Sequence, residues 1–176
     1  MSNTNSPISA GALAGAASPA PTQVDVRGPR FAAWITTVVL TAVLIVSAFS
    51  YPAAALVLGL QAVVFAIGAV GGPRRHPYGR IYAAVVAPRL GPVAEREPVP
   101  PLKFAQLIGF LFAIVGTAGF ATTPPATGGL VGTVLVGTIA TAAALVAAFL
   151  NAAFGICLGC QIYPLVARFR RVPRPA

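Results

Sequence analysis

Four long apolar stretches alternate along the chain with short polar or proline-rich segments. The first covers residues 31–50 and holds no charged side chain. At 1.5 Å per residue, a helix of this length measures about 30 Å, the thickness of the hydrocarbon core of a bilayer. Residues 53–70 and 104–122 show the same pattern, and a fourth stretch begins at Gly128. The pattern predicts an all-α membrane protein with four transmembrane helices.

The fourth stretch is too long for one spanning helix. Residues 128–166 contain no charge, and as a single helix they would measure about 58 Å, nearly twice the bilayer core. Either the helix tilts and protrudes, or it stops near Asn151 and a second segment begins. Asn151, Gly155 and Gly159 favour the interruption of a helix. We therefore predict a kinked or broken end to the fourth span.

The segments between the spans predict two helical hairpins joined by a central loop. Tyr51-Pro52 indicates a very short turn, so the first two spans form one antiparallel hairpin and the last two form the other. Residues 74–103 hold six of the twelve basic residues and the only histidine, His76. This segment is predicted to be an interfacial loop, with a short helix at residues 80–86 and an extended stretch at residues 95–101.

Composition predicts three regions along the chain. Residues 1–23 are rich in Ser, Ala, Gly and Pro, contain no Lys or Arg, and are predicted to be a disordered tail. Residues 24–172 form the predicted four-helix membrane domain, and residues 173–176 form a C-terminal tail.

Charge is scarce and unevenly placed. The chain is 57% hydrophobic and 9% charged, whereas soluble domains carry charge on about a quarter of their residues. The partner implied is therefore a lipid bilayer and not nucleic acid. All twelve basic residues fall before the first span, between the second and third, or after the fourth. By the positive-inside rule this predicts a multi-pass protein of the plasma membrane with both termini in the cytoplasm (N-in/C-in). Homo-oligomerisation is left open.

Cys157 and Cys160 are the only cysteines and the only constellation that points to chemistry. Positions i and i+3 share one face of a helix, so the two thiols can close a disulfide, bind one metal ion or exchange with a partner protein. The alternative is that two small residues merely pack between helices. Zinc would need four ligands, and the chain offers two cysteines and His76, which we expect to be an interfacial residue. No metal and no other cofactor is predicted.

The chain resembles the bacterial DUF4395 family of small membrane proteins, which is frequent in actinobacteria. The residues that carry the resemblance lie in several segments between residues 24 and 172, and they are Val24–Phe31, His76–Tyr82, Pro88–Leu90, Glu95–Pro101, Phe104–Gln106, Asn151–Cys160 and Tyr163. The resemblance implies a four-helix membrane domain without an established activity. It also implies a link to thioredoxin-like or rhodanese-like proteins, near which family members are often encoded.

The sequence thus leads to one functional hypothesis and two alternatives. The hypothesis is a cytoplasm-facing dithiol, Cys157 and Cys160, that takes part in thiol redox chemistry or sulfur transfer with a thioredoxin-like or rhodanese-like partner. Asn151, Gly155, Gly159 and Tyr163 are its predicted supporting residues. The first alternative is a non-catalytic membrane scaffold or accessory subunit, and the second is a small-solute channel. Whether the chain is an enzyme stays open.

Overall fold

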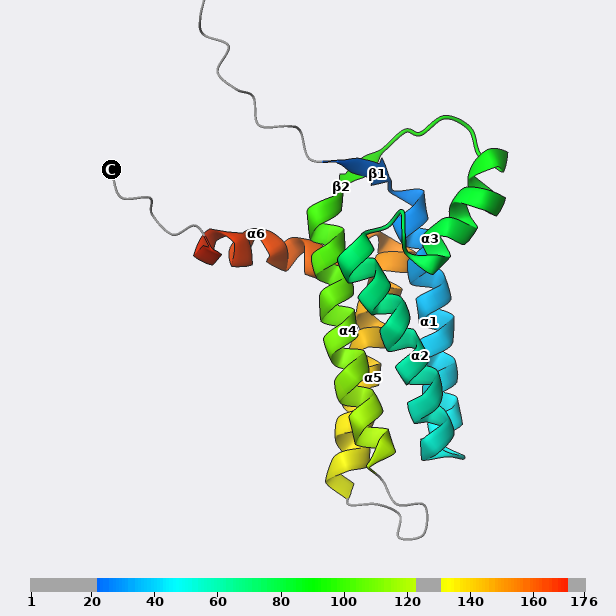
Figure 1. The fold of residues 1–176 in the computed structure, drawn as a ribbon, viewed down its shortest axis with the longest axis vertical. Helices are drawn as coiled ribbons and strands as arrows, with labels where there is room; N and C mark the ends of the chain where they lie inside the picture. Colours follow the sequence, from blue (N-terminus) through cyan, green and yellow to red (C-terminus); the bar gives the residue numbers. More distant parts are fainter. Residues whose placement is uncertain (1–21, 123–130, 171–176) are drawn as a thin grey trace, which may run out of the picture.

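The computed structural model describes residues 22–122 and 131–170, and within these ranges four long apolar helices can each cross a membrane. They are α1 (Arg27–Ser47), α2 (Tyr51–Gly71), α4 (Val99–Ala121) and α5 (Val131–Phe154). The prediction of four long apolar helices, each able to span a membrane, is thereby confirmed in number and approximate position (Figure 1). Most of the predicted disordered tail and the whole C-terminal tail lie outside the described residues.

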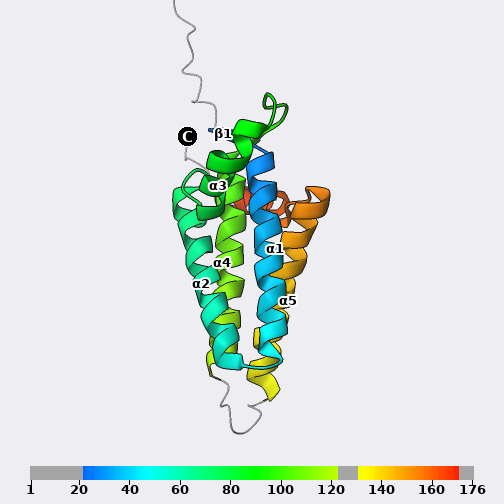
Figure 2. The ribbon, with the colours of Figure 1, turned by 90° about the vertical axis from the view of Figure 1, so that its right-hand side faces the viewer.

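The four helices form an antiparallel bundle. α1 packs against α2 and α5, and α4 packs against the same two helices, so they close a ring around a shared core (Figure 2). Leu40, Leu58 and Phe120 are fully buried in this core. Large apolar side chains also cover the outside, among them Val38 and Leu56, which are 66% and 67% exposed. An apolar outer surface of this kind fits a lipid environment.

Close helix contact in the bundle depends on glycine. A Cβ atom added to Gly119 of α4 would lie 2.7 Å from the backbone nitrogen of Gly137 in α5. Such contacts are typical of membrane helices, where small residues let backbones approach. A Cβ atom added to Gly132, in the first turn of α5, would meet nothing described within 4 Å. The close contact between α4 and α5 therefore depends on Gly137 and not on Gly132.

The connection between α1 and α2 differs from the predicted turn at Tyr51-Pro52. Both residues already belong to α2, and the turn covers residues 48–50. Ser50 caps the new helix by accepting a hydrogen bond from the Ala53 amide at 3.3 Å. Proline fits here because the first helical residues need no amide donor.

One end of the bundle, which we call the polar end, carries the connecting elements. Strand β1 (Gln23–Asp25) pairs antiparallel with β2 (Arg96–Pro98), a feature that the sequence did not predict. Between α2 and β2 lie α3 (Pro77–Ile81), a π-helical turn η1 (Tyr82–Val86) and a 3₁₀ turn η2 (Ala87–Arg89). The predicted extended stretch at 95–101 is extended only in part, because α4 begins at Val99.

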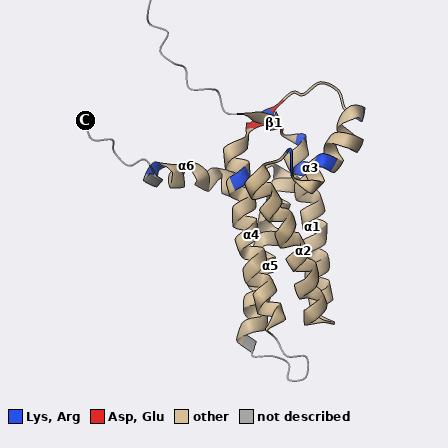
Figure 3. Ribbon diagram, in the orientation of Figure 1, with Lys and Arg blue, Asp and Glu red and all other residues tan. Residues whose placement is uncertain are grey.

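Basic side chains gather at this same end. Figure 3 shows the described Lys and Arg residues around the polar end and along the last helix, α6 (Leu158–Arg170), with none near the opposite end of the described bundle. The three basic segments thus lie on one side, as an even number of spans requires. Which side of the membrane this is stays a prediction.

The long fourth stretch is broken into two helices. α5 ends at Phe154, Gly155 has a φ of 70°, and α6 then runs across the bundle axis (Figure 1). A left-handed residue ends a helix, and glycine takes this conformation without a steric penalty. The Gly155 amide donates to the Asn151 carbonyl at 3.1 Å, which satisfies a carbonyl of the last turn. Of the two alternatives, the break near Asn151 is the one observed.

Candidate functional site

Cys157 and Cys160 are bonded to each other at the start of α6. Their Cα atoms are 5.2 Å apart, a normal spacing for a disulfide. The Cys160 amide donates a hydrogen bond to Cys157 Sγ at 3.3 Å, and the Gln161 amide donates to the Cys157 carbonyl at 3.1 Å. Cys157 therefore occupies the N-cap of α6, where orphan amides of a helix find their acceptors.

The two sulfur-bearing residues have different surroundings. Cys157 is 8% exposed, whereas Cys160 is only half-buried. Cys157 also lines a partly open cavity, and Cys160 is not among the described residues that line it. One residue of the pair thus faces the interior of the bundle, and the other is open to the outside.

Gly159 and Tyr163 hold α6 against α4. A Cβ atom at Gly159 would lie 2.6 Å from both Cα and Cβ of Ala105, so the two helices touch at the backbone. One turn further along, the Tyr163 ring lies 5.9 Å from the Phe104 ring. These contacts fix where the disulfide sits relative to the bundle.

Asn151 and Gly155 form the break that turns the chain into α6. Asn151 lines the cavity and accepts the Gly155 amide through its carbonyl. A Cβ atom at Gly155 would collide with the guanidinium of Arg30 in α1. Glycine is therefore required twice here, for the positive φ and for the room that Arg30 occupies. The predicted supporting residues all lie at or next to the start of α6, although their role in any chemistry stays a prediction.

The cavity has a volume of about 890 Å³ and lies between α1, α4 and α5 near the polar end. Its wall is largely apolar, with many alanines and with Phe65 and Phe112 at its deeper part. The turn α3–η1 closes it on one side, and the start of α6 closes it on another. A cavity of this size is within the range of small-molecule sites, which are about 300–1,000 Å³.

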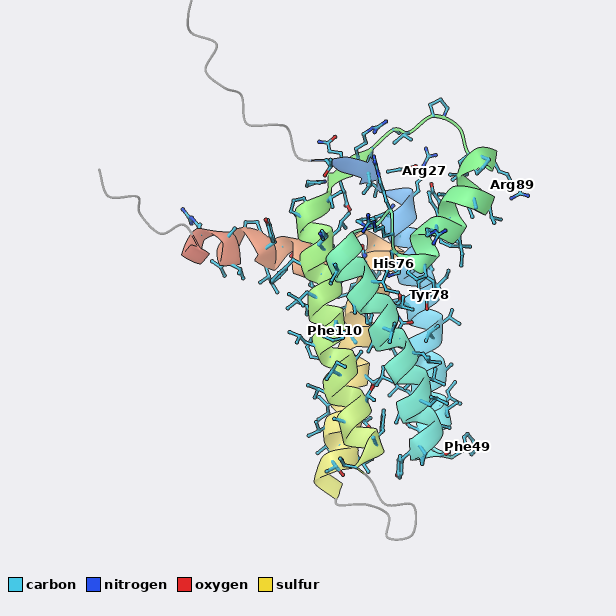
Figure 4. All side chains as sticks on the ribbon, viewed as in Figure 1. Arg27, Phe49, His76, Tyr78, Arg89 and Phe110 are labelled. Carbon is cyan, nitrogen blue, oxygen red and sulfur yellow. A yellow bond between two sulfur atoms is a disulfide. The ribbon has the colours of Figure 1, made fainter. Side chains whose placement is uncertain are left out.

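Uncharged polar side chains interrupt the apolar wall at five positions: Thr36, His76, Tyr82, Gln106 and Asn151. His76 is only 2% exposed, and neither of its ring nitrogens makes a hydrogen bond of normal geometry with a described residue. Gln106 Oε1 is likewise buried without such a bond, although the Gln106 side chain lies close enough to His76 to raise its pKa as a hydrogen-bond partner does. Figure 4 shows His76 inside the polar end of the bundle, beside Tyr78. His76 lies at the polar end, where an interfacial residue is expected, but its ring is buried and not exposed.

Burial sets the ionisation of His76. Loss of solvent lowers the pKa of His76 from 6.5 to about 4, and the neighbouring Gln106 offsets this only in part. The ring is therefore neutral at pH 7, with one nitrogen that donates and one that accepts. Sequence reasoning missed this residue because a lone histidine between Arg75 and Pro77 looks like surface. The signal available was its place in the His76–Tyr82 segment that carries the family resemblance.

Metal ligands do not gather around the pair. In residues 22–122 and 131–170, no three His, Cys, Asp or Glu side chains come together in a way that would hold a metal ion. What the arrangement can do chemically follows from the disulfide and the cavity.

Comparison with known proteins gives one match. The family model described as "Domain of unknown function (DUF4395)" matches residues 24–168, a range that contains all the helices but the last residues of α6. No curated protein and no solved structure matches the chain.

Proposed function

This chain belongs to the DUF4395 family, whose function is unknown, and we propose that its Cys157–Cys160 pair is a reversible disulfide that exchanges electrons or sulfur with a partner protein at the cytoplasmic face of the plasma membrane. The observation that carries the proposal is the geometry of the pair. The two sulfurs are bonded to each other, Cys157 lies at the N-terminus of α6, where its sulfur accepts a hydrogen bond from the Cys160 amide, and Cys160 is more exposed than Cys157. The cytoplasmic placement rests on the basic residues at the polar end and on the positive-inside rule.

The difference in exposure assigns a role to each sulfur. A partner thiolate reaches the more exposed Cys160 first, so it attacks Cys160 Sγ and displaces Cys157. The departing Cys157 thiolate keeps the Cys160 amide as a hydrogen-bond donor and lies at the positive end of the α6 dipole. A stabilised leaving thiolate departs faster. Cys160 is therefore the exchanging residue, and Cys157 is the leaving group.

The exchange balances in both forms of the proposal. With a thioredoxin-like dithiol, the partner's second thiol gives up its proton and attacks the mixed disulfide, which releases Cys160. The partner becomes a disulfide and the pair becomes a dithiol, so two electrons and two protons have moved. With a rhodanese-like persulfide, a thiolate of the reduced pair takes the terminal sulfur and leaves the partner as a thiolate.

The surface around the pair suits a docking protein that carries negative charge. Arg30, Arg75 and Arg168 are exposed at the polar end or on α6. Leu158, Ile162 and Leu165 of α6 are also exposed, which fits a helix that lies in the membrane interface with its pair at headgroup depth.

Mixed-disulfide capture tests the proposal. The variant Cys157→Ser keeps the exposed thiol but lacks the second thiol that, in the reverse direction of the exchange, attacks the mixed disulfide and releases the partner. We therefore expect it to accumulate a covalent complex with the oxidised partner in cells. The matched control is Cys160→Ser, which keeps only the buried thiol and should trap far less. Mass spectrometry of the trapped band identifies the partner.

Two results would overturn the proposal. One is that neither cysteine is alkylated in cells before or after reduction. The other is that the double variant Cys157→Ser/Cys160→Ser still co-purifies with its partner and supports growth as the parent does. The second result would favour a scaffold or accessory subunit.

A further inference from the structure

The cavity beside the disulfide is partly open and lies between three of the long apolar helices, the connecting elements of the polar end and the start of α6. Its residues on α1 include Ala32 and Thr36, those on α4 include Gly109, and those on α5 include Ala144 and Ala147. Cys157 lies on the wall toward α6. The leaving sulfur of the pair thus adjoins a space that extends from the polar end between α1, α4 and α5.

The composition of the wall favours a ligand that is mainly apolar. The uncharged polar groups are few, and the charged members Asp25, Arg74 and Arg80 belong to the connecting elements of the polar end. Asp25 already accepts hydrogen bonds from the Arg27 amide and the Tyr82 hydroxyl. Arg74 and Arg80 are exposed, as expected for residues at the rim near lipid headgroups.

The unpartnered groups indicate what the ligand must offer. A buried polar atom without a hydrogen bond is unfavourable and calls for an explanation. His76 and Gln106 lie close enough to influence each other, but no hydrogen bond of normal geometry joins them, so the His76 ring offers a ligand one donor and one acceptor, and Gln106 Oε1 offers a further acceptor. A planar apolar molecule with an oxygen at its edge would fit these groups. When that oxygen is a carbonyl, it accepts a hydrogen bond from the His76 donor, and when it is a hydroxyl, it donates one to His76 or to Gln106 Oε1.

We infer that this cavity binds the ring of a lipid-soluble quinone, which reoxidises the reduced Cys157–Cys160 pair. The inference rests on the proposed function and names its second substrate. An apolar quinone reaches the cavity from the bilayer, while the protein partner meets Cys160 from the other side. The disulfide therefore separates a membrane-soluble electron acceptor from a water-soluble electron donor.

The reaction balances as a two-electron transfer. The Cys157 thiolate adds to a ring carbon of the quinone, and the Cys160 thiolate then attacks Cys157 Sγ. The disulfide forms, the sulfur–carbon bond breaks, and its electron pair stays on the ring. The ring takes up two protons and leaves as the quinol. His76 donates a hydrogen bond to the quinone carbonyl as negative charge develops on its oxygen.

Purified full-length protein in liposomes tests the inference with three measurements. The first is reduction of the disulfide by a soluble dithiol without quinone. The second is anaerobic oxidation of the prereduced pair by decylubiquinone or menadione, in which we expect one quinol for each disulfide formed. The third is the rise in thermal midpoint that each quinone causes in the Cys157→Ser/Cys160→Ser variant, which reports binding without thiol chemistry.

Variants connect these measurements to the cavity. Ala147→Phe fills the space from α5 and should abolish both quinone oxidation and the thermal shift. Ala153→Phe makes the same change on an exposed position that does not line the cavity, and it should behave as the parent. His76→Leu removes the hydrogen bond and should raise the quinone Kd about fivefold, with dithiol reduction unchanged.

The outcomes separate this inference from the proposed function. Dithiol reduction without quinone-dependent oxidation or binding overturns the quinone site and leaves the exchange proposal in place. Quinone oxidation without exchange with any protein partner supports the site and overturns the exchange proposal. Equal loss of quinone oxidation in Ala147→Phe and Ala153→Phe also overturns the site, because the effect would then not come from the cavity.

Discussion

The contact between Gly159 and Ala105 offers the sharpest test of how the disulfide is positioned. In the variant Gly159→Ala, the new Cβ lies 2.6 Å from Cα and Cβ of Ala105. Carbon atoms pack at about 3.5–4.0 Å, so α6 must move away from α4 by about 1 Å. The nearest atoms belong to backbone and to a Cβ, and neither can rotate out of the way.

The size of the effect follows from the cost of overpacking. Extra methyl groups at tight contacts typically cost about 1–3 kcal/mol. If this free energy destabilises the packing of α6 against α4, the population of molecules in which α6 has separated from α4 rises roughly 5- to 140-fold. Cys157 is 8% exposed, so reagents reach it mainly when α6 opens locally. The rate of alkylation of Cys157 should rise by the same factor.

The assay measures that rate in a Cys160→Ser background, in which no disulfide can form. Gly132→Ala is the matched control, because nothing described lies within 4 Å of its added methyl group. The combination Gly159→Ala/Ala105→Gly removes only one of the two short contacts, since the one to the Ala105 Cα remains, and it should stay fast. An alkylation rate and thermal midpoint equal to those of Gly132→Ala would refute the proposed docking.

Three further predictions concern stability in detergent, read as the thermal midpoint. Burial lowers the pKa of His76 from 6.5 to about 4, so between these values the unfolded chain binds a proton that the folded chain does not. Stability should fall by about 3 kcal/mol as the pH drops from 6.5 to 4, and His76→Gln should flatten this dependence. Tyr82→Phe removes the hydroxyl that donates to Asp25 Oδ2 at 3.1 Å. The free energy of unfolding should fall by about 1–2 kcal/mol, and the midpoint at pH 7 should fall by a few degrees. An unchanged midpoint would show that this hydrogen bond does not stabilise the fold. Gly119→Ala places a methyl group against the Gly137 backbone, so its midpoint should fall well below that of Gly132→Ala.

The spanning helices and their break were predictable because each leaves a local signal. Twenty uncharged residues in a row have few stable arrangements other than a membrane helix. A run of 39 uncharged residues exceeds the bilayer, and Gly155 lies where the chain turns. Only the choice between a tilted and a broken helix needed the structure.

Features that depend on long-range contacts were missed. The pairing of β1 with β2 joins residues more than 70 positions apart, and neither three-residue strand has an alternating pattern of its own. His76 is buried because α3 folds back over the bundle. No residue next to His76 in the sequence indicates this fold-back. The turn at Tyr51-Pro52 was misplaced because proline signals both turns and helix starts. The difference between the two cysteines arises from the cavity, which is lined by segments from β1 to α6 that lie far apart in the sequence.

The strand pair has a consequence for how the protein can be assembled. The segment before α1 is joined to the segment before α4 by two backbone hydrogen bonds, one from the Val99 amide to the Thr22 carbonyl and one from the Val26 amide to the Glu95 carbonyl. The Arg27 guanidinium also donates to the carbonyls of Gly91 and Pro92 in the connecting loop. The two helical hairpins are therefore held together by these noncovalent contacts as well as by the covalent loop near Gly91. Two polypeptides expressed from a gene divided at Ala94 should associate in the membrane and restore the whole bundle, whereas a first half that lacks residues 22–26 should not rescue the second half.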